Sequence, residues 1–288
     1  LMHSSSNLML ADASFTAIEE MLAEKPLAET KKQPVPQNGE ICLNHVSFQY
    51  EAGVKALDDV SLTIRPGTVT ALVGESGGGK STVVNLIARF WDVSEGSVTV
   101  GGVEVRELDY ADWMKHISIV FQDTNLFKMS VAENVAMYKP GASREEIMEA
   151  LRQARCEDIL EKLPNGVDSV IGARGVYLSG GEMQRIALAR AILKDAPIVL
   201  LDEATAFADA ENEYLIQKAL DILLHGKTVL MIAHRLQTIV HADQIIVMQR
   251  GGIAEQGTHE ELMQRQGVYA KMYHEYENSV SWKIGGWA

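Results

Sequence analysis

Along the chain, short apolar runs alternate with segments in which apolar side chains recur every three or four positions, which predicts strands separated by helices. The expected strands share a short, mostly apolar run and span residues 41–50, 60–64, 69–73, 117–121, 198–201, 229–232 and 244–248. The expected helices share helical spacing of their apolar residues and span 8–24, 81–90, 182–193, 211–224 and 258 towards 276. This order favours an α/β fold with a mostly parallel sheet covered on both faces.

From residue 131 to residue 193 the pattern is mainly helical, and this interrupts the alternation of strands and helices. The interruption predicts a helical subdomain of about residues 124–192. Ser143 with Glu146 has the spacing of a helix start in which side chain and backbone cap each other. Thr258 with Glu261 has the same spacing at the start of the last expected helix.

The first expected helix is followed by a polar stretch with several prolines up to Gly39, which is typical of a linker. We therefore predict a connector helix and linker at 1–39, a compact domain at 40–277 and a tail at 278–288. The chain begins with Leu1 rather than Met, which indicates a piece of a longer protein or an expression scar.

The composition, with 47% hydrophobic and 23% charged residues, is that of an ordinary globular protein. A net charge of -13 argues against nucleic acid as the main partner, because nucleic-acid-binding proteins usually carry excess Lys and Arg. The two cysteines, Cys42 and Cys156, form neither a disulfide framework nor a zinc site and indicate a reducing compartment. No signal peptide and no apolar run of about 18 residues is present, so this chain is not expected to span a membrane itself.

The clearest chemical signal is a glycine-rich loop between the expected strand at 69–73 and the expected helix at 81–90. Its pattern is G-x-x-x-x-G-K-[ST], formed by Gly74, Glu75, Ser76, Gly77, Gly78, Gly79, Lys80, Ser81 and then Thr82. Glycines let several backbone N–H groups point inward at phosphate oxygens, and the following helix directs its positive end there. Lys80 can reach the β- and γ-phosphates, and the Ser81 hydroxyl can bind Mg²⁺. A glycine-rich turn with a chance lysine is the alternative, but the flanking strand and helix favour a nucleoside triphosphate site.

Two carboxylates, Asp202 and Glu203, directly follow the apolar strand at 198–201. Asp202 suits a role in binding Mg²⁺ at the carboxyl end of a strand, where the sites of α/β proteins lie. Glu203 is suited to polarising an attacking water. An acidic pair after a strand is by itself weak evidence for a nucleotide site. It is stronger evidence here because the pair follows a phosphate loop in the same chain.

Leu178-Ser179-Gly180-Gly181-Glu182 lies between these two elements and resembles the signature segment of the ATP-binding cassette family, usually LSGGQ. The resemblance extends over about residues 40–276. It implies a P-loop NTPase cassette with a RecA-like, mostly parallel sheet core, an antiparallel β subdomain and an α-helical signature subdomain. It also implies functional roles for four further residues that follow the family's order, namely Tyr50, Gln122, Asp209 and His234.

By this resemblance, Tyr50 stacks on adenine, and Gln122 binds Mg²⁺ and links the nucleotide to a membrane domain. Asp209 lies in the loop that crosses a cassette dimer, and His234 contacts the γ-phosphate. Glu203, His234 and Gln122 are then the expected catalytic residues, and Ser81, Gln122 and Asp202 the expected Mg²⁺ ligands. Taken singly, each of Tyr50, Gln122 and His234 is more often a packing or surface residue, but together they favour the family's site.

In the family two cassettes pair head to tail, so Ser179, Gly180 and Gly181 are expected to bind the γ-phosphate held by a second cassette. The implied protein is an ATP-hydrolysing motor at the cytoplasmic face of the cell membrane, with ATP and Mg²⁺ as cofactors. Its expected partners are a second cassette, identical or different, and a transmembrane domain of the same parent polypeptide.

Residues 126–135 and the N-terminal connector are similar to the exporter-type branch of the family. The segment Ala206-Phe207-Ala208-Asp209 is reminiscent of members of that architecture that take up metal–siderophore complexes. Glu182 replaces the usual Gln, and we expect its carboxylate to face away from the γ-phosphate or to weaken the partner's site. Ala173 stands where exporters often carry Glu, and Gly78 stands where Ser is common.

Two other interpretations stay open from the sequence. The chain could be a soluble cassette protein that acts on DNA or ribosomes, although the acidic charge and the connector helix argue against it. It could also be a small-molecule kinase or another P-loop enzyme, although this explains residues 74–82 and not residues 178–182.

Overall fold

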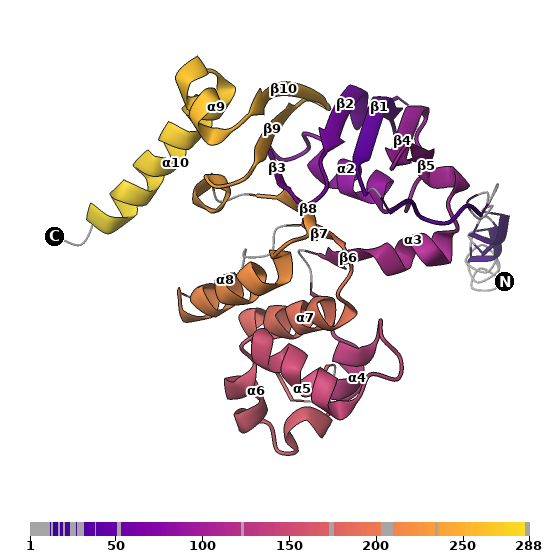
Figure 1. The fold of residues 1–288 in the computed structure, drawn as a ribbon, viewed down its shortest axis with the longest axis vertical. Helices are drawn as coiled ribbons and strands as arrows, with labels where there is room; N and C mark the ends of the chain where they lie inside the picture. The colour runs from indigo at the N-terminus through magenta and orange to yellow at the C-terminus, as the bar shows by residue number, and fades with distance from the viewer. Residues whose placement is uncertain are drawn as a thin grey trace, which may run out of the picture.

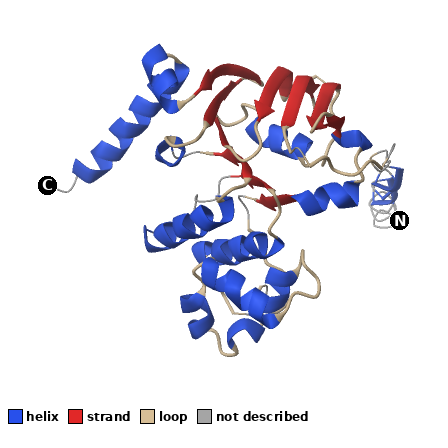
Figure 2. Ribbon diagram, viewed as in Figure 1, coloured by secondary structure: helices blue, strands red, loops and turns tan. Residues whose placement is uncertain are grey.

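The computed structural model describes residues 12, 14–16, 18–19, 21–23, 27, 32–37, 39–50, 53–121, 124–172, 176–202, 210–233 and 236–285. These residues form two β-sheets and a group of helices below them (Figures 1 and 2). Among the residues described, none of the helices combines the length and the apolar character needed to cross a bilayer.

The smaller sheet is antiparallel and has the strand order β2-β1-β4-β5. Its strands are β1 (Ile41–Phe48), β2 (Leu57–Ile64), β4 (Glu95–Val100) and β5 (Val103–Glu104). The alternation of buried and exposed residues along β2 turns one face towards the core. The sequence analysis missed β4 and β5, because both are short and polar residues interrupt their apolar pattern.

The larger sheet has the strand order β10-β9-β3-β8-β7-β6, and all neighbouring pairs are parallel except β10 with β9. Its strands are β3 (Val69–Val73), β6 (Ile117–Val120), β7 (Ile198–Asp202), β8 (Thr228–Ile232), β9 (Gln244–Gln249) and β10 (Gly252–Gly257). The expectation of a mostly parallel sheet is confirmed. Each predicted strand of this sheet is present, whereas β10 was missed because its residues are mostly polar and only half buried.

Both faces of the larger sheet are covered, as the continuous apolar runs of its strands require. On one face, Ile198 and Leu200 of β7 pack in a core with α2 (Lys80–Ile87) and the antiparallel sheet. On the other face, Val199 and Leu201 pack in a second core with the helical group. The helices α2 and α7 (Gly180–Lys194) therefore lie on opposite faces of the sheet.

The helical group below the sheets in Figure 1 is built around α7. Its other helices are α4 (Val131–Ala136), α5 (Arg144–Gln153) and α6 (Glu157–Lys162), and α8 (Ala210–Leu224) packs beside α7. A Ser with a Glu three residues later caps α4, α5 and α7 reciprocally. The predicted cap of Ser143 by Glu146 is confirmed, and α3 (Tyr110–His116), joined to β6, was missed.

The last helix of the sequence analysis is two helices, α9 (His259–Arg265) and α10 (Val268–Gly285). Gln266 adopts a left-handed conformation with φ 51° and ends α9. The carboxylate of Glu255 then accepts the backbone N–H groups of Val268 and Tyr269, both at 2.9 Å, and so starts a new helix. The prediction of a single helix was wrong because Glu255 belongs to β10, and only the tertiary structure brings it to this turn.

At the N-terminus, residues 14–16, 18–19 and 21–23 are helical, as their apolar spacing predicts. The apolar side chains on this helix are exposed, and they are Phe15, Ile18, Met21 and Leu22. Short 3₁₀ turns at Val105–Glu107, Gly166–Asp168 and Leu236–Ile239 complete the regular structure of the described residues.

Candidate functional site

The glycine-rich loop joins the carboxyl end of β3 to the first residue of α2, and three of its glycines have positive φ angles. Gly74 has a φ of +136°, and a Cβ there would lie 2.0 Å from the carbonyl oxygen of Met248. Gly79 has a φ of +96°, and a Cβ there would lie 2.6 Å from Leu57 Cδ2. Because both the backbone conformation and the close packing exclude a side chain, these positions require glycine.

Lys80 is the first residue of α2 and is only 5% exposed. Its ammonium group donates hydrogen bonds to the carbonyl oxygens of Gly74 and Glu75, each at 2.8 Å. Lys80 therefore curls over the loop that precedes it, while Ser81 follows it on the exposed side of the helix. A helix N-terminus with a cationic side chain folded over a glycine loop suits the binding of phosphate.

Tyr50 lies beside the first turns of α2, although it precedes them by some 30 residues. Its hydroxyl donates to Thr82 Oγ1 at 3.3 Å and accepts from Asn85 Nδ2 at 3.2 Å. Its ring meets Phe48 and Trp91 edge-on, with centroid separations of 4.8 and 5.4 Å. Tyr50 is 44% exposed, so an aromatic surface is available next to the phosphate loop.

Trp91 belongs to the same aromatic cluster and was missed by the sequence analysis. It follows the predicted helix directly, at a position where a single aromatic residue carries no functional signal. Its contact with Tyr50 joins the segment after β1 to the segment after α2.

Asp202 ends β7 and lies at the same edge of the sheet as the glycine-rich loop. In the register of the parallel strands, Asp202 is opposite Ile232 of β8, and Ile232 is opposite Leu72 of β3. Leu72 is two residues before Gly74, so the half-buried Asp202 lies two strands away, at about 10 Å between strand axes. The loop and the carboxylate therefore border one site at the carboxyl ends of the strands.

Four predicted site residues, Gln122, Glu203, Asp209 and His234, lie outside the described residues, as does Ala173. Two of them directly follow described residues at this edge of the sheet. Asp202 immediately precedes Glu203, and Ala233, whose N–H donates to Leu72 O at 3.1 Å, immediately precedes His234. Within the described ranges, no three His, Cys, Asp or Glu side chains cluster to form a metal site.

The signature segment, residues 178–182, forms the start of α7. Ser179 is the N-cap, and Gly180 and Gly181 are the first two helical residues, so α7 begins two residues before the predicted start at Glu182. Gly180 is exposed, whereas Gly181 is buried against Asn212 of α8, and a Cβ there would lie 2.7 Å from Asn212 Cβ. The segment thus exposes a helix N-terminus whose first N–H groups are suited to an anion.

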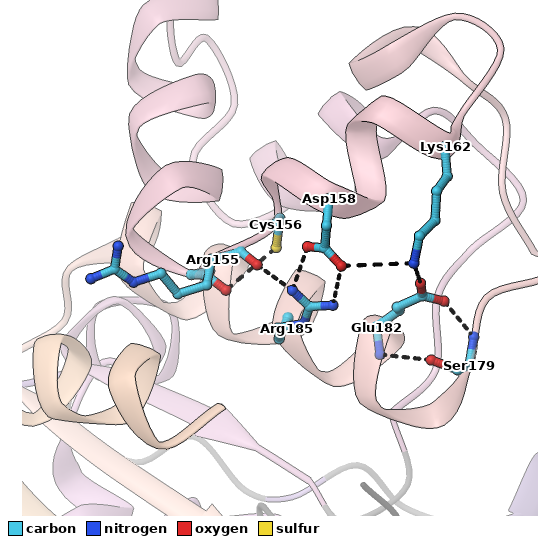
Figure 3. Close-up of polar contacts among 8 residues, drawn as sticks. Arg155, Cys156, Asp158, Lys162, Ser179, Glu182 and Arg185 are labelled. Atoms are coloured by element: carbon cyan, nitrogen blue, oxygen red, sulfur yellow. Dashed lines mark hydrogen bonds and ion pairs between the residues drawn. The ribbon is translucent and has the colours of Figure 1, made fainter. Parts of the chain in front are cut away.

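The carboxylate of Glu182 is turned back onto its own helix start and onto α6 (Figure 3). It accepts the Ser179 N–H at 2.9 Å and the Lys162 ammonium at 3.0 Å. Burial alone raises the pKa of Glu182, but the hydrogen bonds from Ser179 and Lys162 outweigh burial and hold its pKa below the ordinary value. The Glu182 carboxylate is therefore bound by groups of its own chain.

A second contact between α6 and α7 continues this network. Arg185, only 1% exposed, forms two hydrogen bonds to the carboxylate of Asp158, at 2.6 and 2.9 Å, and another to the carbonyl of Arg155. The hydrogen bond from Arg185 lowers the pKa of Asp158. Burial alone lowers the pKa of Arg185, and the bond to Asp158 outweighs it and raises that pKa. Lys162 lies 3.8 Å from Asp158, so one chain of charges connects Glu182 to Arg185.

Comparison with known proteins extends these observations. The family described as ABC transporter matches residues 57–206. The mycobactin import ATP-binding/permease protein IrtA of Mycolicibacterium thermoresistibile is 52% identical over 235 residues, which cover 82% of this chain and 26% of that protein. The ATP-dependent lipid A-core flippase of Legionella pneumophila is 48% identical over 235 residues, which cover 82% of this chain and 40% of that protein.

The structure of a bacterial Atm1-family ABC exporter with ATP bound superposes with a TM-score of 0.83. It is 34% identical and covers 94% of this chain, which matches 47% of the exporter chain. This chain therefore spans less than half of the length of each of these relatives.

Proposed function

Since the chain belongs to the ABC transporter family, whose ATP-hydrolysing domain it is, we propose that it works as one half of a pair of cassettes. ATP binding joins the two cassettes head to tail, and hydrolysis separates them. This cycle drives a transmembrane domain that belongs to the same parent polypeptide. The observation that carries the proposal is the glycine-rich loop, in which Gly74 and Gly79 leave no room for side chains and Lys80 folds over the backbone.

In this proposal the loop and the start of α2 bind the triphosphate. The backbone N–H groups of residues 74–82 donate to phosphate oxygens, and Lys80 exchanges its bonds to Gly74 and Glu75 for bonds to the β- and γ-phosphates. Tyr50, whose exposed ring lies beside Thr82, stacks on the adenine. These contacts orient the nucleotide with its γ-phosphate towards the carboxyl end of β7.

The residues at this edge also fit a magnesium ion. Mg²⁺ prefers oxygen ligands, and in such sites it commonly takes one or two carboxylates together with substrate phosphates and waters. Ser81, Asp202 and Gln122 would hold the ion, and the half-buried Asp202 and exposed Ser81 provide such oxygens. When bound, Mg²⁺ neutralises charge that develops on the phosphate oxygens.

Hydrolysis then depends on residues that follow β7 and β8 in the sequence. We assign Glu203 to orienting the attacking water in line with the γ-phosphorus, and His234 to stabilising charge on the γ-phosphate. Gln122 connects the state of the nucleotide to the membrane domain. We assign Asp209 to the loop that crosses to the second cassette.

We assign the other half of the ATP site to the second cassette. Its Ser179, Gly180 and Gly181 would contact the γ-phosphate held by this chain. The packing of α2 and α7 on opposite faces of the sheet supports this assignment, because it separates the signature helix from the phosphate-loop helix of the same chain (Figure 1). The second cassette is a copy of this chain or a related one.

The relatives support a membrane-linked motor over a soluble ATPase. The relatives include an import ATP-binding/permease protein, a flippase and an exporter, each more than twice as long as the matched segment. We propose that the cassette lies at the cytoplasmic face of the membrane. The resemblance of residues 206–209 to siderophore importers remains a sequence-based prediction of the transported class.

The test is the dependence of ATP turnover on protein concentration. A site completed by a second chain makes turnover rise faster than linearly with concentration until the pair is saturated. The matched control is Glu203→Gln, which we expect to bind ATP and to pair in its presence while losing most turnover. Strictly proportional turnover in the wild type, or wild-type turnover from Glu203→Gln, would contradict the proposal.

A further inference from the structure

The signature segment carries a negative charge at a position where the family usually has a neutral glutamine. Glu182 is the third residue of α7, one residue after Gly181. Under the proposed function, on which this inference rests, the partner's γ-phosphate approaches the N–H groups of this first turn. An uncompensated carboxylate there would repel the phosphate and cancel part of the positive potential of the helix N-terminus.

The structure supplies a compensating charge from another helix. Lys162, the last residue of α6, places its ammonium group 3.0 Å from the Glu182 carboxylate (Figure 3). The Glu182 side chain is only 13% exposed, whereas Lys162 is 66% exposed and reaches inward from solvent. The Lys162 ammonium group therefore forms a direct ion pair with the largely buried Glu182 carboxylate.

The other acidic group near Lys162 is already occupied. Asp158 accepts two hydrogen bonds from Arg185, at 2.6 and 2.9 Å, and lies 3.8 Å from Lys162. Since Arg185 balances the charge of Asp158, Glu182 is the acidic group that Lys162 neutralises. The same contact ties α6 to the first turn of α7.

We infer that Lys162 is a positioning residue for the signature: it neutralises Glu182 and holds its carboxylate away from the partner's γ-phosphate. Ser179, Gly180 and Gly181 then present a helix N-terminus without net negative charge. In this chain the pair of Lys162 and Glu182 does what a neutral glutamine does elsewhere in the family. The inference predicts that Lys162 matters only while residue 182 is a carboxylate.

The experiment is a double-mutant cycle of Lys162→Met and Glu182→Gln in the full chain, read by the apparent KM for ATP under pairing conditions. Methionine keeps most of the apolar stem of lysine and removes the charge. We expect Lys162→Met to raise the apparent KM by about two- to fivefold, as for a charge at a helix N-terminus. Higher salt should narrow this difference because it screens the repulsion between the Glu182 carboxylate and the phosphate.

The double variant separates charge compensation from a structural contact. If Lys162 acts by neutralising Glu182, Lys162→Met has no effect on the apparent KM when Glu182→Gln is the background. A role of Lys162 that does not depend on the charge of Glu182 predicts the same loss in both backgrounds, and that result would overturn the inference. The matched control is Lys139→Met, which removes another lysine of this helical group, paired with Glu146 at 2.7 Å, and should leave the apparent KM unchanged.

Failure of this inference differs from failure of the proposed function. If the wild type does not hydrolyse ATP and two chains do not pair when ATP is present, the proposed function is wrong. The double-mutant cycle then has no wild-type KM to refer to. If the wild type does both and Lys162→Met matches it at low salt, only the assignment of Lys162 is wrong.

Discussion

The phosphate loop requires glycine at particular positions, where the absence of a side chain matters as much as the side chain of Lys80 does. Gly74 needs both a positive φ and a direct approach to the backbone of Met248. Met248 belongs to β9, which pairs with β3 on the side away from β8, so the loop is packed against a neighbouring strand. The pattern of glycines predicted the loop, and the contact with Met248 explains why this glycine cannot be exchanged.

We predict that Gly74→Ala lowers ATP affinity by at least about tenfold, or about 1.4 kcal/mol. The new Cβ would lie 2.0 Å from the Met248 carbonyl oxygen, so the loop must move away from the conformation that binds phosphate. The measurement is equilibrium binding of ATP. The control is Gly67→Ala, at a φ of +70° but with no atom within 4 Å of the new Cβ. It should cost about 1–2 kcal/mol of stability through its backbone alone and leave ATP affinity intact.

At the scale of elements, the helical group is held together by caps and by the contacts between α6 and α7. The spacing of Ser143 and Glu146 predicted a capping box, and the same spacing at Ser130–Glu133 and Ser179–Glu182 forms two more that the sequence analysis missed. Both could have been found by the same rule. The ion pair between Asp158 and Arg185 could not, because 27 residues separate its members.

We predict that Asp158→Asn destabilises the protein by about 2 kcal/mol at neutral pH, since it leaves the buried Arg185 charge without its partner. This figure is discounted because the Asp158 side chain is 44% exposed and partly screened by water. Urea unfolding measures the change. The control is Asp168→Asn, which breaks the exposed pair of Asp168 with Arg144 and should cost clearly less.

The same pair predicts a pH dependence with a definite sign. The pKa of Asp158 is lowered in the folded state, so its stabilisation is fully present above the ordinary value of 3.8. It is lost as the pH falls through the lower, folded-state pKa. The difference in stability between wild type and Asp158→Asn should therefore shrink only below about pH 4. A constant difference down to acid pH would contradict the assigned ion pair.

The strands and the helix that the sequence analysis missed are short or polar, so their own apolar pattern is weak. β5 has two residues, β10 is half exposed and polar, and α3 has only seven residues. Such elements depend on a neighbour rather than on their own apolar pattern: β10 pairs with β9 alone, and β5 with β4 alone. Local periodicity cannot reveal an element that tertiary contacts stabilise.

At the scale of the whole molecule, the two helices that follow the halves of the proposed site, α2 and α7, lie on opposite faces of the sheet. This arrangement leads to a complementation test. Lys80→Met disables the phosphate loop and keeps the signature. Gly180→Asp keeps the phosphate loop and places a carboxylate at the exposed first residue of α7, where it favours the helix but repels a phosphate. A mixed pair contains one intact site, formed by the loop of one variant and the signature of the other.

We predict that each variant alone hydrolyses little ATP and that their mixture exceeds the sum of the two separate rates. The control is a mixture of Lys80→Met with Glu203→Gln, which contains no intact site because both changes disable the same half. Steady-state phosphate release measures all four samples. Equal rates for the two mixtures would argue against a site shared between chains.

The sequence by itself determined two local features, the strand–loop–helix order of residues 69–87 and the continuous apolar strands of a parallel sheet. It also predicts that Lys80 and Ser81 bind phosphate and Mg²⁺. These features depend on residues near one another in the chain, so periodicity and spacing reveal them. The resemblance to the cassette family assigns Tyr50 and residues 178–182 to nucleotide binding from the sequence alone.

Only the tertiary structure decided which distant residues meet. Tyr50 reaches Thr82 across 32 residues, Lys162 reaches Glu182 across 20, and α2 and α7 take opposite faces of one sheet. An apolar pattern specifies which side of an element is buried and leaves open which neighbour covers it. That choice depends on the packing of the whole chain, so the ion pair of Glu182 with Lys162 and the separation of α2 from α7 became visible only in three dimensions.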